Sequence, residues 1–194
     1  MNQPDGLEYA VVDEVCIPTG RANLVAFLYF IPTAFVGLTL FTSLWGIQPL
    51  MDGISLLKSH TVRLIILLVI GVILHEGLHG SVWAIFAKNG LKSIRFGIKW
   101  AYLTPYSHCN EPLRRNRYIA GGIMPALITG IIPSVLAIIF SWGWLLWLGV
   151  FFTGAAGGDF MVLFRLLRFD KNLFIQDHPD EVGFIALKLK GKEA

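Results

Sequence analysis

Residues 75–79 read His75-Glu76-Gly77-Leu78-His79, and they stand inside an apolar run that extends from Val62 to Ala87. Residues four apart on a helix lie on the same face one turn apart, so His75 and His79 can offer two imidazoles to one metal ion. Glu76 follows the first histidine, where a carboxylate can take a proton from water at the open position of the metal. The stretch therefore predicts a helix that carries a metal site.

The spacing is that of the His-Glu-x-x-His motif of zinc metalloproteases. A chance match is the competing explanation, because only three positions of the pattern are fixed. The surroundings favour the metal, since a carboxylate and two imidazoles in hydrocarbon are costly unless something compensates their polarity. Zinc is the usual occupant of such a ligand set, so we expect Zn²⁺ as the cofactor.

Composition indicates a membrane protein. The 194 residues are 55% hydrophobic, and the mean hydropathy is +0.63, which is too apolar for an ordinary soluble domain. We expect one membrane-embedded α-helical domain over residues 1–194, with an N-terminal segment at 1–23, a transmembrane core at 24–167 and a tail at 168–194. About four transmembrane helices are predicted, with approximate bounds Leu24–Leu44, Val62–Ala87, Tyr118–Phe140 and Gly143–Leu167.

Apolar and polar side chains alternate from Lys92 to Tyr102. A period of two predicts a half-buried strand, so a small β-strand or hairpin follows the motif helix directly. Its edge could hold an extended substrate through main-chain hydrogen bonds. The candidate substrate-binding residues, from this strand and the turn after it, are Phe96, Ile98, Trp100, Asn110 and Glu111. Residues 7–17 suit either a short strand or an interfacial segment, and one short strand is expected within residues 184–190.

The Lys and Arg residues are distributed unequally between the two ends of the predicted spans. With four spans, 14 of the 16 lie on one side, and only Lys58 and Arg63 lie on the other. The positive-inside rule then places both termini and the strand-bearing loop in the cytoplasm. The sequence pI near 9.0 is explained by these basic residues, so no nucleic-acid partner is predicted.

Asp159 is the expected third metal ligand. At about 1.5 Å per residue, His75 lies roughly 20 Å into the second span, His79 about 26 Å, and Asp159 about 24 Å into the fourth, which runs in the same direction. A catalytic zinc site takes three protein ligands, and a carboxylate is a usual one. The rival ligands are His108, Glu111 and the Asp177-His178 pair. We expect these rivals to be exposed, because their segments are polar.

These residues carry a resemblance to a known family. The motif in an apolar span, the alternating strand and the later Asp159 resemble the site-2 protease arrangement of intramembrane metalloproteases. Four further segments resemble a bacterial family of membrane zincin peptidases. These segments are Thr104-Pro105-Tyr106, Cys109-Asn110-Glu111-Pro112, Gly157-Gly158-Asp159 and Asp177-His178-Pro179. In the site-2 proteases the Asp stands in a Leu-Asp-Gly context, whereas Gly-Gly-Asp-Phe occurs here.

The leading hypothesis is a zinc-dependent membrane endopeptidase. Its metal ligands are His75, His79 and Asp159, its general base is Glu76, and its partners are the bilayer and a membrane protein or peptide substrate. The first alternative is a catalytically silent membrane scaffold or adaptor that retains a structural metal. A metal-ion transporter ranks below both, because the interiors of the first and third spans contain no Asp, Glu, His, Lys or Arg.

Overall fold

The computed structural model describes residues 8–179 and 181–190. The backbone divides into two compact units, which are described separately below. Unit 1 contains Glu76–Met124 together with the N-terminal part up to Ala22 and the C-terminal part from Asp159. Unit 2 contains Asn23–His75 and Pro125–Gly158. The division does not test the single-domain prediction, which stays a prediction.

Among the described residues, three helical segments are long and apolar enough to cross a membrane. The first is α1 (Thr19–Trp45) and the second is α3 (Thr61–Phe86). The third, Arg115–Phe140, joins α4 (Arg115–Pro125), the π-helical turn Ala126–Ile131 and α5 (Ile132–Phe140). A fourth candidate consists of α6 (Gly143–Ala155) and α7 (Gly157–Leu166), which bend by 45° at their junction. The predicted apolar helices are therefore present, and their number is three or four.

Unit 2 consists of helices packed through small residues. Helix α2 (Gln48–Ser59) lies against the start of α6, where a side chain at Gly143 would meet the Pro49 carbonyl. Its core is a cluster of buried residues formed by Phe41, Leu50, Ala137, Leu146 and Val150. Outside this core the helices expose large apolar side chains, Val62 and Ile73 of α3 among them. Such faces suit contact with lipid.

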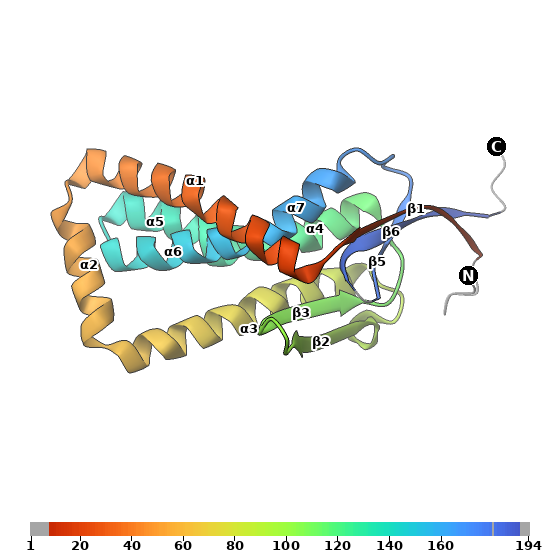
Figure 1. Cartoon of the computed structure of the whole chain (residues 1–194), viewed down its shortest axis with the longest axis horizontal. Helices are drawn as coiled ribbons and strands as arrows, with labels where there is room; N and C mark the ends of the chain where they lie inside the picture. Colours follow the sequence, from red (N-terminus) through yellow and green to blue (C-terminus); the bar gives the residue numbers. More distant parts are fainter. Residues whose placement is uncertain (1–7, 180, 191–194) are drawn as a thin grey trace. The chain divides into compact units, whose positions relative to one another are not determined.

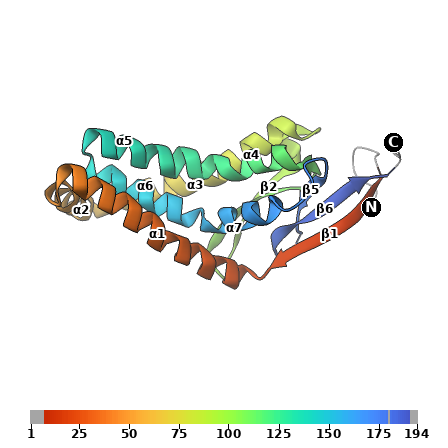
Figure 2. The same cartoon turned by 90° about the horizontal axis from the view of Figure 1, so that it is seen from above.

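A four-stranded antiparallel sheet forms in unit 1, in the order β1-β6-β5-β4. Its strands are β1 (Tyr9–Ile17), β4 (Leu113–Arg114), β5 (Phe174–Asp177) and β6 (Val182–Leu189). Figure 2 shows β1 and β6 side by side along their length. Of the two alternatives for residues 7–17, a strand or an interfacial segment, β1 shows the strand, and the tail, expected to hold one short strand, contains β5 as well as β6. Buried residues of this sheet, of α4 and of α7 form the core of the unit.

A separate hairpin follows α3, as predicted. It pairs β2 (Ile94–Lys99) with β3 (Thr104–Cys109) antiparallel, after a short 3₁₀ turn, Gly90–Ser93. In Figure 1 both strands run beside the later half of α3. The strand is shorter than the predicted range of residues 92–102, because residues 100–103 form the turn. The expectation of a half-buried strand is wrong for most of it, since Ile94 is buried whereas Phe96 and Ile98 are exposed.

Two glycines of α3, one before the motif in sequence and one after it, permit close packing. A Cβ at Gly71 would lie 2.1 Å from the Phe152 ring of α6, both within unit 2. A Cβ at Gly80 would lie 2.5 Å from the Phe96 ring of β2, both within unit 1. The absence of these two side chains therefore lets another helix and the hairpin approach α3.

Candidate metal centre

Helix α3 holds the two histidines of the motif. It runs unbroken from Thr61 to Phe86, so His75 and His79 stand one turn apart on one face. Both are buried, with exposed fractions of 9% and 5%. His75 ends the first segment of unit 2 and His79 belongs to unit 1, but the continuous helix fixes their spacing. The two imidazoles are thus presented together in an apolar environment.

Asp159 supplies a carboxylate to the same place. It lies in the first turn of α7, within unit 1, and its Oδ1 is 3.4 Å from His79 Nε2. One potential ligand atom from each of His75, His79 and Asp159 lies within 4.8 Å of the other two. The bend between α6 and α7 begins this helix immediately before the acidic residue. The structure therefore brings together the three residues that were predicted as metal ligands.

The separation of one pair of these groups suits zinc. Two atoms at about 2.0–2.1 Å from a tetrahedral zinc ion stand roughly 3.3 Å apart, and the separation between His79 Nε2 and Asp159 Oδ1 is 3.4 Å. Two imidazoles and one carboxylate are a donor set of catalytic zinc sites, which keep a fourth position open. A metal bound by this set could accept a water or substrate oxygen at that position.

A backbone carbonyl orients the His79 ring. His79 Nδ1 lies 2.9 Å from the Gly121 oxygen of α4. When Nδ1–H donates to this carbonyl, the neutral ring leaves Nε2 as an acceptor on the side of Asp159. The contact is therefore of the kind that fixes the tautomer of a metal-binding histidine.

An aromatic stack supports the same ring from the other side. Trp83 stacks on His79 with ring centroids 5.1 Å apart, and Tyr118 stacks on Trp83 at the same separation. The Trp83 indole N–H also donates to the Tyr118 carbonyl at 2.9 Å. A Cβ at Gly121 would lie 2.1 Å from Trp83 Nε1, so only glycine fits here. Close packing of α4 on α3 thus holds the imidazole plane.

Glu76 is half-buried and contacts the hairpin. The Ser107 hydroxyl of β3 donates to Glu76 Oε2 at 3.1 Å. Gly80 lies one helical turn after Glu76, and the Phe96 ring of β2 covers this glycine. The hairpin therefore borders the face of α3 that carries the carboxylate.

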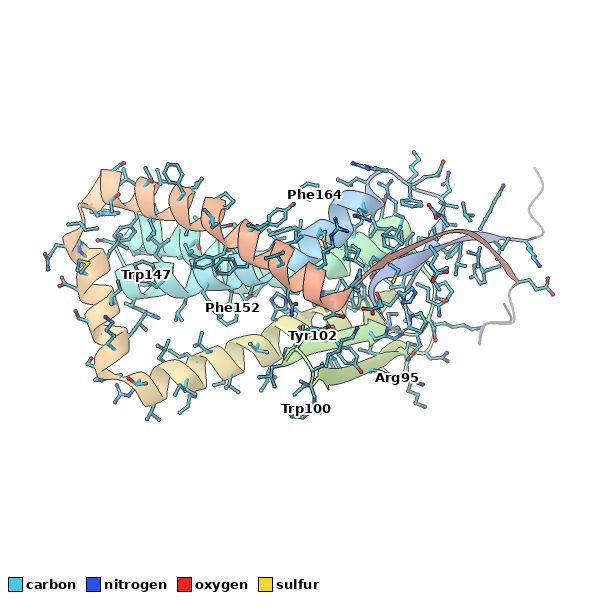
Figure 3. The ribbon with its side chains drawn as sticks, in the orientation of Figure 1. Arg95, Trp100, Tyr102, Trp147, Phe152 and Phe164 are labelled. Atoms are coloured by element: carbon cyan, nitrogen blue, oxygen red, sulfur yellow. The ribbon has the colours of Figure 1, made fainter. Side chains whose placement is uncertain are left out.

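The three candidate substrate-binding residues of the hairpin are exposed. The exposed fractions are 56% for Phe96, 43% for Ile98 and 74% for Trp100. Trp100 stands at the end of the hairpin, in the turn between its strands (Figure 3). Phe96 is the one of the three that reaches α3. Large apolar side chains are thus available on the hairpin next to the metal centre.

The other two candidates are engaged in hydrogen bonds within unit 1. Asn110 Nδ2 donates to the Ser93 carbonyl at 3.1 Å. Glu111 accepts the backbone N–H of Lys88 at 2.7 Å and the Ser93 hydroxyl at 2.7 Å. The expectation that Glu111 is exposed is wrong, since it is 7% exposed. Its contacts join the turn after β3 to the end of α3, and substrate binding by either residue stays a prediction.

A comparison with known families identifies the class of protein. A family model described as "Putative zincin peptidase" matches residues 68–174, which is more than half of the chain and includes the motif, the hairpin and Asp159. The chain belongs to this zincin peptidase family. No curated protein and no solved structure gives a match.

Sequence reasoning did not find the groups that support the zincin motif. Ser107 and Gly121 have no motif of their own, and their roles follow from the way β3 and α4 pack on α3. Asp177 was expected to be exposed, which is wrong. Its carboxylate is buried in unit 1, where it accepts the Cys109 N–H at 2.6 Å and the Tyr118 hydroxyl.

Burial also changes the acid–base behaviour of Asp177. It raises the pKa of the carboxyl above its ordinary value. The charge of His108 and the hydrogen bonds from Cys109 and Tyr118 oppose this effect. Asp177 thus contacts α4 through Tyr118 and lies near the metal centre. It is a buried group and not a surface group.

Proposed function

We propose that this protein is a zinc-dependent membrane endopeptidase that cleaves membrane-associated substrates. His75, His79 and Asp159 would hold the metal, and Glu76 would act as the general base. The observation that carries the proposal is the meeting of the three ligand atoms within 4.8 Å beside Glu76 of the motif. Membership of the zincin peptidase family supports metallopeptidase chemistry.

Each residue has a defined task in this proposal. Bound zinc supplies a Lewis acid that favours deprotonation of water and polarises a peptide carbonyl. Glu76 accepts the proton of the attacking water and returns it to the leaving amine. Ser107 donates a hydrogen bond to one oxygen of Glu76 and so helps to hold the carboxylate in a fixed orientation. The Gly121 carbonyl keeps the His79 ring in one tautomer.

We further propose that the hairpin holds the substrate in an extended conformation. A helical substrate hides its peptide bonds, so cleavage requires an unwound segment. Within the described residues β2 pairs with β3 alone, which leaves its other edge available for main-chain hydrogen bonds. Phe96, Ile98 and Trp100 would contact apolar substrate side chains.

The membrane location is supported by the apolar helices described above. We propose the plasma membrane of a bacterium, with both termini and the hairpin in the cytoplasm, because 14 of the 16 Lys and Arg residues then face that side.

Substitution of Glu76 tests the enzymatic function. The full chain in detergent is incubated with a panel of single-span membrane proteins and unfolded casein, and zinc content is measured in the same samples. Glu76→Gln should abolish hydrolysis while zinc content stays at the wild-type level. Retained hydrolysis in this variant would exclude Glu76 from the mechanism. Zinc binding without hydrolysis by the wild type would instead favour the scaffold hypothesis.

Trp100 tests the substrate-binding role of the hairpin. Trp100→Ala should raise KM several-fold and leave kcat unchanged, because the side chain binds substrate without touching the reacting atoms. The matched control is Trp142→Ala, which removes another exposed tryptophan, at the start of α6. An equal rise of KM in both variants would contradict the proposal.

A further inference from the structure

A cavity lies in unit 1, and none of the three proposed metal ligands lines it. Its volume is about 160 Å³, an order of magnitude more than the roughly 15 Å³ that one water molecule requires. Three basic residues line it, and they are Lys88, which follows α3, Arg114 of β4, and Arg117 in the first turn of α4. The proposed peptidase chemistry uses none of the three.

Aromatic rings hold both guanidinium groups in place. Arg114 Cζ lies 5.6 Å from the centroid of the Phe174 ring, and Arg117 Cζ lies 5.4 Å from the centroid of the Phe86 ring. Phe174 and Phe86 also line the cavity. A guanidinium that stacks on a ring keeps the N–H groups of its edge available for an oxyanion. Two pre-oriented hydrogen-bonding forks therefore border the same space.

The cavity remains positively charged although an acidic residue lines it. Three cations face one carboxylate, that of Glu111. The Glu111 oxygens accept hydrogen bonds from the Lys88 backbone, from Asn89 and from Ser93. Burial raises the pKa of this carboxyl, but the same hydrogen bonds outweigh burial and lower it overall. The Glu111 carboxylate thus forms its hydrogen bonds with groups of the loop. Arg114 and Arg117 can therefore bind an external anion.

The position of the cavity suggests the source of the anion. Phe86 is the last residue of α3, and Arg115 is the first residue of the next membrane-length segment. Two apolar helices therefore each have one end beside this cavity, as they would at the headgroup level of a bilayer. Basic pockets in such positions suit lipid phosphates.

We propose that this cavity binds a phosphate group. Arg114 and Arg117 would contact its oxygens through paired N–H groups, and Lys88 would add a point charge. The phosphate could belong to an anionic phospholipid or to a free phosphate ion, and the experiment below separates these sources. The inference does not depend on the metal centre.

The test uses the full chain in a neutral detergent. Native mass spectrometry and the midpoint of thermal unfolding report binding of three probes: dioctanoyl phosphatidate, dioctanoylglycerol and inorganic phosphate. Dioctanoylglycerol has the same chains as the phosphatidate but no phosphate, so it should not bind. Binding of phosphatidate alone assigns the site to a lipid headgroup, and equal binding of inorganic phosphate assigns it to the free ion.

Substitutions identify the cavity as the binding site. Each guanidinium should contribute about tenfold to affinity, so Arg114→Gln with Arg117→Gln should weaken phosphate binding about a hundredfold. The matched control is Arg95→Gln. Arg95 is also exposed in unit 1, but it lies on the side of β2 that points away from α3 (Figure 3) and does not line the cavity. Its loss should leave the affinity unchanged.

Two results would overturn the proposal. The first is that the double variant binds phosphatidate with an affinity within twofold of the wild-type value. The second is that dioctanoylglycerol binds as tightly as phosphatidate. If the double variant does not fold, Arg114→Lys with Arg117→Lys keeps both charges but removes the planar forks, and it should still weaken binding several-fold. Chelation of zinc should not change the affinity, so failure of the peptidase proposal can be distinguished from failure of this one.

Discussion

The Ser107 hydroxyl donates a hydrogen bond of 3.1 Å to Glu76 Oε2. The contact joins the middle of β3 to the one carboxylate of the His-Glu-x-x-His motif, two elements that both belong to unit 1. A carboxylate that acts as a general base must present one oxygen to water in a fixed direction. The hairpin therefore has a structural connection to the proposed chemistry, besides the substrate-binding role suggested by its exposed side chains.

Removal of this hydroxyl should slow catalysis. A hydrogen bond to a charged group contributes about 1.5–3 kcal/mol, so Ser107→Ala should lower kcat by about tenfold or more. KM and zinc content should not change, because Ser107 is neither a proposed metal ligand nor a proposed substrate-binding residue. Ser107→Thr keeps the hydroxyl and is the matched control. Steady-state kinetics and metal analysis provide the measurements, and a wild-type kcat in Ser107→Ala would rule out the positioning role.

Zinc should stabilise the folded protein through Asp159. A ligand at a hundred times its Kd stabilises the native state by about 2.7 kcal/mol, which for a chain of this size raises the unfolding midpoint by about 5–10 °C. Chelation should reverse the rise, and Asp159→Ala should reduce it strongly. Asp52→Ala removes an exposed carboxylate of α2 and should leave it intact. A full zinc-dependent shift in Asp159→Ala would show that another residue is the third ligand.

The membrane-length helices could be predicted from the sequence because each one depends on a local run of apolar residues. The apolar run from Val62 to Ala87 corresponds to α3 at Thr61–Phe86, one residue away at each end. The spacing of His75 and His79 follows from helix geometry alone. Asp159 required one further step, the comparison of depths in two spans, and the structure brings it to the histidines.

Contacts between segments that are distant in sequence could not be predicted in the same way. The N-terminal strand was expected, but its pairing with β6 depends on chain topology and not on local pattern. Glu111 and Asp177 lie in polar segments, which favours exposure, yet both are buried. Backbone N–H groups that are distant in sequence, those of Lys88 and Cys109, satisfy their carboxylates and so permit burial.

Glu111 should make stability depend on pH in the acidic range. Its folded-state pKa lies below the ordinary value of 4.5. The unfolded chain therefore binds this proton more readily than the folded chain does. The stabilisation is complete above about pH 4.5, the unfolded value, and is lost as the pH falls through the folded value. Glu111→Gln should lower stability by about 1–3 kcal/mol at pH 7.

The check is chemical unfolding at several pH values between 3 and 7. The difference between wild type and Glu111→Gln should shrink as the pH falls, because protonation removes the same charge in the wild type. Glu8→Gln is the control, since Glu8 is exposed near β1. A difference that stays constant with pH would show that packing, and not charge, explains the effect.

Gly121 should be required for metal binding without being a ligand. A methyl group at this position would lie 2.1 Å from Trp83 Nε1, so Gly121→Ala must displace either α4 or the indole that stacks on His79. Displacement of α4 also moves the Gly121 carbonyl away from His79 Nδ1. Loss of such a supporting contact typically weakens metal binding by about 10–100-fold. Gly77→Ala is the control, because a methyl group there meets no atom within 4 Å. Zinc titration of both variants measures the effect, and equal affinities would show that packing around Gly121 does not orient the histidine.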